Sequence, residues 1–365
     1  MKQNRRRFLL LTGLTVAGCV GKDIAANPLE SSPPTPVPAP DRVKIADFYP
    51  APPGMHAPKR GEVRLAVISD LNGAYGATDY SQEVKRAVEL IPAWQPDLVI
   101  CSGDMVAGQL ASLREEQMQA MWAAFDRHIA TPLNQAAIPF SFTIGNHDAS
   151  ASINSQGEFR FAKEREVAAA YWNDPARNLR LNFVDRAGFP FYYSFLQNGI
   201  FFLSWDASTA KIDPKQIAWV KQSLSSPIAR EARLRIVIGH LPLYAVAVGR
   251  DSWGNFLTES DTLRSLLEEN NVHTYISGHH HAYYPAHLGR LQLLNCGALG
   301  NGPRRWLGSP LSPEKTLTLV DIDGEQTRYT TYNMTTLEVF NAQKLPRTIT
   351  GPSGRILRRD IQATV

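Results

Sequence analysis

The sequence predicts an α/β fold, in which buried strands alternate with amphipathic helices. Short apolar runs typical of strands alternate with segments whose apolar residues recur at helical spacing. Five of these runs end on Asp, Asn or His, and α/β folds gather their ligands at the carboxyl ends of strands. The apolar fraction of 44% and the charged fraction of 20% are ordinary for a globular protein with a sizeable core.

The expected strands and helices follow one another along the chain. Strands are predicted at 62–70, 97–104, 138–144, 191–196, 200–206, 234–242, 272–276, 291–296, 317–321 and 327–332. Helices are predicted at about 81–91, around 118–125, at 215–221 and at 260–270. Asn198-Gly199 and Asp323-Gly324 are hairpin signals. The stripe of Met118, Met121, Trp122 and Phe125 is typical of a helix packed on a core.

Three consecutive histidines, His279, His280 and His281, follow the strand at 272–276. Each ring has two nitrogens that need partners, so metal binding explains the run better than packing, with a polar loop as the alternative. In extended backbone, residues two apart share a face. We therefore expect His279 and His281 to point to one site and His280 to point away.

The other strand ends carry side chains that could share this site. They are Asp70, Asp104, Asn146 with His147, and His240. Because the carboxyl ends of neighbouring strands meet at one edge of a sheet, we expect these side chains to converge.

The charge distribution argues against nucleic-acid binding. The sequence pI is about 8.9 and the net charge is +4. Lys2, Arg5, Arg6 and Arg7 account for all of that excess. The rest of the chain has no net charge, and so offers no electrostatic footprint for a phosphate backbone.

The first 18 residues have the pattern of an export signal, with a basic start, an apolar run at 8–14 and small residues after it. The run is too short to span a bilayer. Residues 4–9 resemble a twin-arginine (Tat) signal, and residues 16–19 resemble a bacterial lipobox in which Cys19 is acylated. A plain cleaved signal is the alternative. We expect an exported bacterial lipoprotein, anchored in the membrane through Cys19 and facing the periplasm or the cell exterior.

A proline-rich stretch, 28–40, separates this signal from the first strand. It is expected to be an extended stalk. The predicted organisation is a signal at 1–18, a linker at 19–60, one domain at 61–340 and a peripheral tail at 341–365. Cys101 and Cys296 lie in apolar contexts typical of buried, unpaired thiols, although one disulfide is also compatible with an oxidising compartment.

The motifs Asp70-Leu71-Asn72, Gly103-Asp104, Gly145-Asn146-His147-Asp148, Gly239-His240 and Gly278-His279-His280-His281 occur in this order. Together they resemble the motifs of the calcineurin-like metallophosphoesterases, which include purple acid phosphatases and cyclic-nucleotide phosphodiesterases. The resemblance covers about 62–300. It implies a four-layer α/β/β/α sandwich of two mixed sheets flanked by helices. It also implies a hydrolase that cleaves a phosphomonoester or phosphodiester with two metal ions and a metal-bound hydroxide.

By that resemblance, Asp104 bridges two metals. Asp70 and His281 complete the first site, and Asn146, His240 and His279 complete the second. His147 is implied to be the proton donor or electrostatic stabiliser, with Asp148 orienting it. The implied ions are divalent or trivalent, with Mn, Fe or Zn favoured, and the expected partner is a phosphate-ester substrate bound by a monomer.

Asn72 departs from the family pattern, which usually has Asp-x-His. A neutral amide oxygen in place of an imidazole leaves the first site weaker and favours harder ions there. The alternative function is therefore a catalytically impaired, lipid-anchored binding or scaffold domain of the same fold. Tyr75 is a weak candidate for the Tyr that purple acid phosphatases use near this position.

Several other residues near the motifs have weaker support. His280, Tyr283 and Tyr284 are candidates for substrate contact or for loop packing. Arg304, Arg305 and Trp306 could meet a phosphate or a base, although an exposed surface is the simpler expectation. The remaining histidines, His56, His128, His273 and His287, have no motif support.

Overall fold

The computed structural model describes residues 48–362, which belong to one compact unit. The predicted signal at 1–18, Cys19 and most of the proline-rich linker lie outside the described residues. No helix in the described part is both long and apolar enough to cross a membrane.

The described chain alternates strands and helices, as the sequence predicts. The strands are β1 Val63–Ile68, β2 Leu98–Cys101, β3 Phe140–Phe142, β4 Phe183–Gly188, β5 Tyr192–Gln197, β6 Ile200–Ser204, β7 Leu234–Ile238, β8 Thr274–Ser277, β9 Tyr284–Leu288, β10 Leu291–Asn295, β11 Thr316–Asp323, β12 Gln326–Asn333, β13 Thr348–Gly351 and β14 Gly354–Arg358. The helices are α1 Gln82–Leu90, η1 Ile91–Trp94, α2 Glu115–Phe125, η2 Asp126–Ala130, α3 Thr131–Gln135, α4 Asn146–Ala149, α5 Ala162–Trp172, α6 Pro214–Leu224, α7 Pro227–Glu231, α8 Ser260–Glu269 and η3 Ala342–Lys344.

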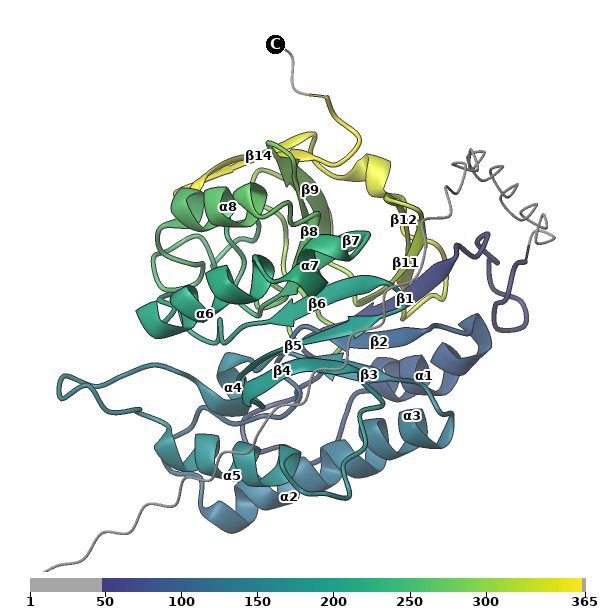
Figure 1. Ribbon diagram of the computed structural model, residues 1–365. Helices are drawn as coiled ribbons and strands as arrows, with labels where there is room; N and C mark the ends of the chain where they lie inside the picture. The colour runs from purple at the N-terminus through teal and green to yellow at the C-terminus, as the bar shows by residue number, and fades with distance from the viewer. Residues whose placement is uncertain (1–47, 363–365) are drawn as a thin grey trace, which may run out of the picture. The chain divides into compact units, whose positions relative to one another are not determined.

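Two mixed sheets form the centre of the fold. One has the order β12-β11-β1-β2-β3, and the other has the order β13-β14-β9-β10-β8-β7-β6-β5-β4. Figure 1 shows α1, α2, α3 and α5 on one outer side and α6, α7 and α8 on the other. The predicted α/β class and the layered arrangement of two mixed sheets flanked by helices are confirmed.

The strands that carry the predicted site are neighbours within each sheet, and β3 forms one edge of the five-stranded sheet. β1, β2 and β3 pair in parallel, as do β6, β7 and β8. Parallel strands are covered on both faces, and every residue of β1 and β2 is accordingly buried. The predicted apolar stripe of α2 is also buried, so its assignment to the core is confirmed.

Both predicted hairpins are present. Gln197 pairs with Ile200 across Asn198-Gly199, where both turn residues have positive φ, and Asp323 pairs with Gln326. Several elements have no prediction from the sequence, among them α5, α7, β4 and β9, whose apolar patterns are short or broken by charged residues. The tail, predicted to be peripheral, adds the β13–β14 hairpin to β9 at one edge of the nine-stranded sheet.

The segment just before β1 packs against the domain through a buried arginine. Arg64 makes two hydrogen bonds to the Asp321 carboxylate, at 2.8 and 3.1 Å. Its Nη1 donates to the carbonyls of Pro50 and Trp94, and its Nη2 also donates to the carbonyl of Pro58. Cys101 and Cys296 are buried and unpaired, as the simpler expectation had it.

Candidate metal centre

The strand ends that the sequence singles out lie at adjacent positions in the two sheets. Asp70, Asp104 and Asn146 follow β1, β2 and β3, which are neighbours in one sheet, while His240 and His279 follow the neighbouring strands β7 and β8 of the other. Backbone bonds join these loops: Asp70 N donates to Gly103 O at 3.0 Å, and Gly278 N donates to His240 O at 2.9 Å. Between the sheets, the backbone N of His279 donates to Asp70 Oδ1 at 3.1 Å, so the polar ends of the two sheets lie together.

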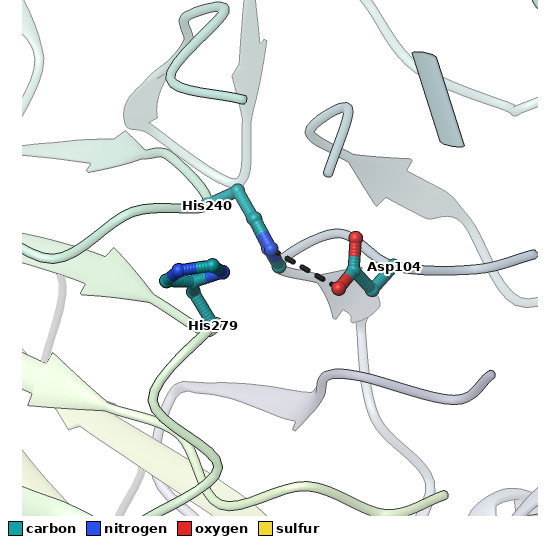
Figure 2. Close-up of side chains that lie close together, drawn as sticks. All are labelled: Asp104, His240 and His279. Atoms are coloured by element: carbon teal, nitrogen blue, oxygen red, sulfur yellow. Dashed lines mark ion pairs between the residues drawn. The ribbon is translucent and has the colours of Figure 1, made fainter. Parts of the chain in front are cut away.

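One group of candidate ligands consists of Asp104, His240 and His279, all buried. Figure 2 shows the three side chains pointing toward one another. His240 Nε2 lies 3.3 Å from Asp104 Oδ2. Asn146 joins the group, because its Oδ1 lies 2.9 Å from His240 Nε2 and 2.8 Å from His279 Nδ1.

A second group consists of Asp70, Asp104 and His281. His281 Nε2 lies 3.2 Å from Asp70 Oδ1. Within each group the candidate ligand atoms lie within 4.8 Å of one another, and Asp104 belongs to both. The structure thus brings together the residues that the resemblance names, and Asp104 is common to both groups.

Two of the histidines direct their Nε2 atoms at this centre. His240 Nδ1 lies 2.8 Å from the Ser102 carbonyl, and His281 Nδ1 lies 2.8 Å from the Gly302 carbonyl. A carbonyl only accepts, so these nitrogens carry the proton. Each Nε2 then faces a carboxylate oxygen, to which it donates when the ring is charged, and it can bind a metal ion when the ring is neutral. The donor set therefore fits metal ions whose imidazole ligands are fixed by outer hydrogen bonds.

The charges of the centre suit the same chemistry. Burial alone would raise the pKa of Asp104, but the neighbouring His240 and His147 outweigh it and hold that pKa below its ordinary value. Burial likewise opposes ionisation of Asp70, and His281 outweighs it and lowers that pKa. Burial disfavours the charged form of His240, yet the Asp104 carboxylate raises its pKa to about 9. Both carboxylates are therefore ionised at neutral pH, which is the form that binds cations.

The backbone of the candidate ligands is strained. Asp70, Asp104, His279 and His281 all have φ between 52° and 63°. Non-glycine residues rarely adopt this region, and such residues cluster at functional sites. His279 and His281 both face the centre, as expected, but the predicted reason is wrong: β8 ends at Ser277, and left-handed rather than extended backbone directs the two rings.

Glycines allow the loops to approach one another closely. A Cβ on Gly278 would lie 2.1 Å from Ser69 Oγ, and one on Gly103 would lie 2.5 Å from His240 Nδ1. Gly103 also has a φ of +97°. Gly103 and Gly278 are therefore explained by the packing of one strand end against another.

His147 lies at the edge of the centre. Its backbone N donates to Asp104 Oδ1 at 2.8 Å, and its Nδ1 donates to the Gly108 carbonyl at 2.9 Å. The ring of Tyr75 lies 5.2 Å from that of His147, so this half-exposed tyrosine contacts the histidine. With Nδ1 bound to the loop, Nε2 is the atom that can exchange a proton with a substrate.

The structure corrects the predicted role of Asp148. Its carboxylate accepts hydrogen bonds from the backbone N of Met105, Val106 and Gly145, at 2.7, 2.9 and 2.7 Å. It therefore does not orient the His147 ring, which the Gly108 carbonyl holds. Burial, followed by the charge of Asp104, raises the pKa of Asp148 to about 7.

Two further residues position the site and carry no motif signal. Gln109 Oε1 accepts a hydrogen bond of 2.7 Å from Asn146 Nδ2. Glu164 on α5 accepts from the backbone N of Gln109 at 2.9 Å and of Leu110 at 3.3 Å. Glu164 thus fixes the loop that holds both Asn146 and His147. A prediction of helix α5 from the sequence is the only signal that could have indicated Glu164, and the sequence analysis does not predict this helix.

Asn72 is buried beside the second group, with its backbone N 3.2 Å from Asp104 O. In the described part of the chain its side-chain amide makes no hydrogen bond.

His280 faces away from the centre, since its Nδ1 accepts from Val246 N and its Nε2 donates to Asn255 O. Tyr283 and Tyr284 are buried, so packing explains them.

The expectation for residues 304–306 is only partly right. Arg305 is exposed, but Arg304 is half-buried and Trp306 is 2% exposed, with its Nε1 donating to Tyr283 O. The background histidines His56, His128, His273 and His287 belong to neither ligand group.

Comparisons with known proteins agree with this geometry. The sequence profile of calcineurin-like phosphoesterases matches residues 63–283, which is more than half of the chain. No protein with a curated description matches the sequence.

Solved structures with this fold include two phosphatases. Purple acid phosphatase PPD1 from seeds of yellow lupin (Lupinus luteus) is 15% identical, with a TM-score of 0.54, over 76% of this chain and 52% of that one. A dimetal phosphatase from Danio rerio is 12% identical, with a TM-score of 0.51, over 77% of this chain and 98% of that one. The chain spans about half of the lupin phosphatase, and at these identities the likeness shows the fold alone.

Proposed function

The chain belongs to the calcineurin-like phosphoesterase family, and on that basis we propose that it hydrolyses a phosphomonoester or phosphodiester with two metal ions. The observation that carries the proposal is the pair of ligand groups joined by Asp104. When bound, two metal ions would supply positive charge that stabilises the transition state of phosphoryl transfer and would acidify a water molecule.

The residues of the two groups and His147 would have different roles. Asp70 and His281 would hold one ion, and Asn146, His240 and His279 would hold the other, with Asp104 between them. Mn, Fe and Zn are the proposed ions, because the donor set mixes imidazole nitrogen with carboxylate oxygen. Because His147 Nδ1 donates to the Gly108 carbonyl, Nε2 carries a proton only in the imidazolium form, so His147 would protonate a leaving oxygen only when its ring is charged.

We further propose that the protein is exported and held at the membrane through Cys19. This proposal is supported by the twin arginines and the lipobox pattern of the sequence alone.

The experiment that tests the enzyme proposal combines metal analysis with turnover. The purified protein is expected to bind two metal ions and to hydrolyse an aryl phosphate or a bis-aryl phosphate in the presence of Mn. Asp104→Asn should lower the rate by roughly a thousandfold and reduce the bound metal below two, because both sites lose the shared carboxylate. His56→Gln, a change at an exposed histidine outside both groups, is the matched control.

The same measurements decide the alternative that Asn72 suggests. A wild-type protein that binds one metal ion or none, and that hydrolyses neither ester with any of the proposed ions, would refute the enzyme proposal. Such a protein would be a binding or scaffold domain. Loss of activity in His56→Gln as large as that in Asp104→Asn would also contradict the assignment.

A further inference from the structure

Two arginines, Arg250 and Arg304, lie side by side next to the candidate metal centre. The segments that carry them are paired: Val248 N donates to Arg305 O at 2.8 Å, and Leu307 N donates to Val246 O at 2.9 Å. A Cβ on Gly249 would lie 3.4 Å from Arg304 Nη1, so the guanidinium of Arg304 reaches the residue that precedes Arg250. The backbone pairing therefore fixes two positive charges together.

Neither guanidinium has a carboxylate partner among residues 48–362. The Nε atoms of both are buried and make no hydrogen bond there. Three other arginines also have a buried, unbonded Nε, but each of those forms an ion pair: Arg177 with Asp126, Arg233 with Glu62 and Arg264 with Glu268. Burial, and then the nearby charge of Arg250, lowers the pKa of Arg304. Two half-buried cations without an anionic partner destabilise the folded protein unless a ligand supplies the negative charge.

Both arginines are connected to the metal centre. Arg250 Nη1 donates to Asn255 Oδ1 at 2.9 Å, and the same oxygen lies 3.4 Å from His279 Nε2. The backbone N of Arg304 donates to His281 O at 3.0 Å. His279 faces the ligand group with Nδ1 and faces Asn255 with Nε2. Arg250 is therefore separated from the ligand atoms by Asn255 and the imidazole ring of His279.

We propose that Arg250 and Arg304 form a subsite for a second phosphoryl group of the substrate, adjacent to the one that is hydrolysed. Two guanidinium charges match the charge of about −2 on a terminal phosphate, and the planar fork of each suits phosphate oxygens. The separation from the ligand atoms places this subsite beside the metal centre. The inference rests on the proposed function and names its substrate class as esters of diphosphate.

Inorganic pyrophosphate and orthophosphate are the probes, used as inhibitors of aryl phosphate hydrolysis at a fixed concentration of free metal. The wild-type protein should bind pyrophosphate more tightly than orthophosphate. Arg304→Gln and Arg250→Gln should each weaken pyrophosphate binding by about tenfold to a hundredfold, the loss of one charge-assisted interaction. The inhibition constant of orthophosphate should change less than about threefold. Arg305→Gln, at the exposed neighbouring arginine, should change neither constant and controls for metal chelation by pyrophosphate.

Calorimetric titration with pyrophosphate separates this inference from the proposed function, because it needs no turnover. Binding that depends on Arg304 in a protein without hydrolytic activity would support the subsite and contradict only the proposed reaction. Hydrolysis by a protein whose pyrophosphate binding is unchanged in both variants would overturn the subsite. An equal loss of orthophosphate and pyrophosphate binding would also overturn it, because the arginines would then hold the reacting phosphoryl group.

Discussion

Single residues outside the motifs fix the rings that face the metal centre. Ser102 and Gly302 act through backbone carbonyls, which any residue could provide, so no sequence pattern reveals them. Asn255 is different, since its side chain lies between His279 Nε2 and Arg250 Nη1. The orientation of His279 is the property that should depend on Asn255.

Asn255→Ala should weaken metal binding and lower kcat/KM by about 10-fold to 100-fold, the usual effect of removing an outer partner of a ligating histidine. Asn255→Asp keeps an acceptor oxygen facing His279 and should restore most of the metal affinity. Metal titration of the purified variants measures both effects. Asn173→Ala, at the end of α5 and outside both ligand groups, is the control. An aspartate variant as impaired as the alanine variant would show that Asn255 does not act through its oxygen.

At the scale of elements, helix α5 supports the loop that follows β2. Glu164 on that helix is 3% exposed and accepts hydrogen bonds from two backbone N–H groups of the loop. The loop in turn offers Gly108 O to His147 and Gln109 Oε1 to Asn146. Burial raises the pKa of Glu164 to about 7, although the backbone donors act in the opposite direction.

The raised pKa of Glu164 predicts how the stability of the folded protein changes with pH. The folded state holds a proton on Glu164 up to pH about 7, whereas the unfolded chain releases it near 4.5. The contribution of the group to the free energy of unfolding is therefore fully present below pH 4.5 and is lost as the pH rises through 7. Wild-type stability relative to Glu164→Gln should fall by about 3 kcal/mol between pH 4.5 and 8, measured by urea unfolding.

The control for this experiment is on the same helix. Glu166 is exposed and pairs with Lys163, so Glu166→Gln should leave the pH dependence of wild-type stability unchanged. If Glu164→Gln follows the wild-type pH dependence throughout, the Glu164 carboxyl does not titrate in this range. A role for Glu164 in the site should also appear as a lower kcat with little change in KM, since the loop positions His147 and contributes no direct contact to the ester.

At the scale of the whole molecule, the proposed lipid anchor joins the catalytic unit to a membrane through the proline-rich linker. In the cells that produce it, the wild-type protein should sediment with membranes, because buried acyl chains contribute about 0.8 kcal/mol per methylene. Cys19→Ser should move the protein to the soluble fraction, as measured by immunoblotting of fractionated cells. Ser31→Ala, in the linker, is the control and should remain with the membranes. A soluble wild-type protein would contradict the anchor.

The sequence alone determined the class of fold and the residue types at the strand ends. Apolar runs of strand length require burial, and an Asp or His directly after such a run lies at the carboxyl end of a strand. The local pattern is therefore enough to place Asp70, Asp104 and His240 at strand ends. The two hairpins were equally local, since Asn-Gly and Asp-Gly favour one turn geometry.

Only the tertiary structure decided how these ends meet. The strand order β1-β2-β3 in one sheet and β8-β7 in the other brings five distant segments together and makes Asp104 common to two ligand groups. It also decided that left-handed backbone directs His279 and His281, that Asp148 serves the loop backbone, and that Arg250 lies beside Arg304. These features depend on contacts between residues far apart in the chain. Local propensity carries no information about such contacts, because the free energy that selects them comes from packing the two sheets against each other.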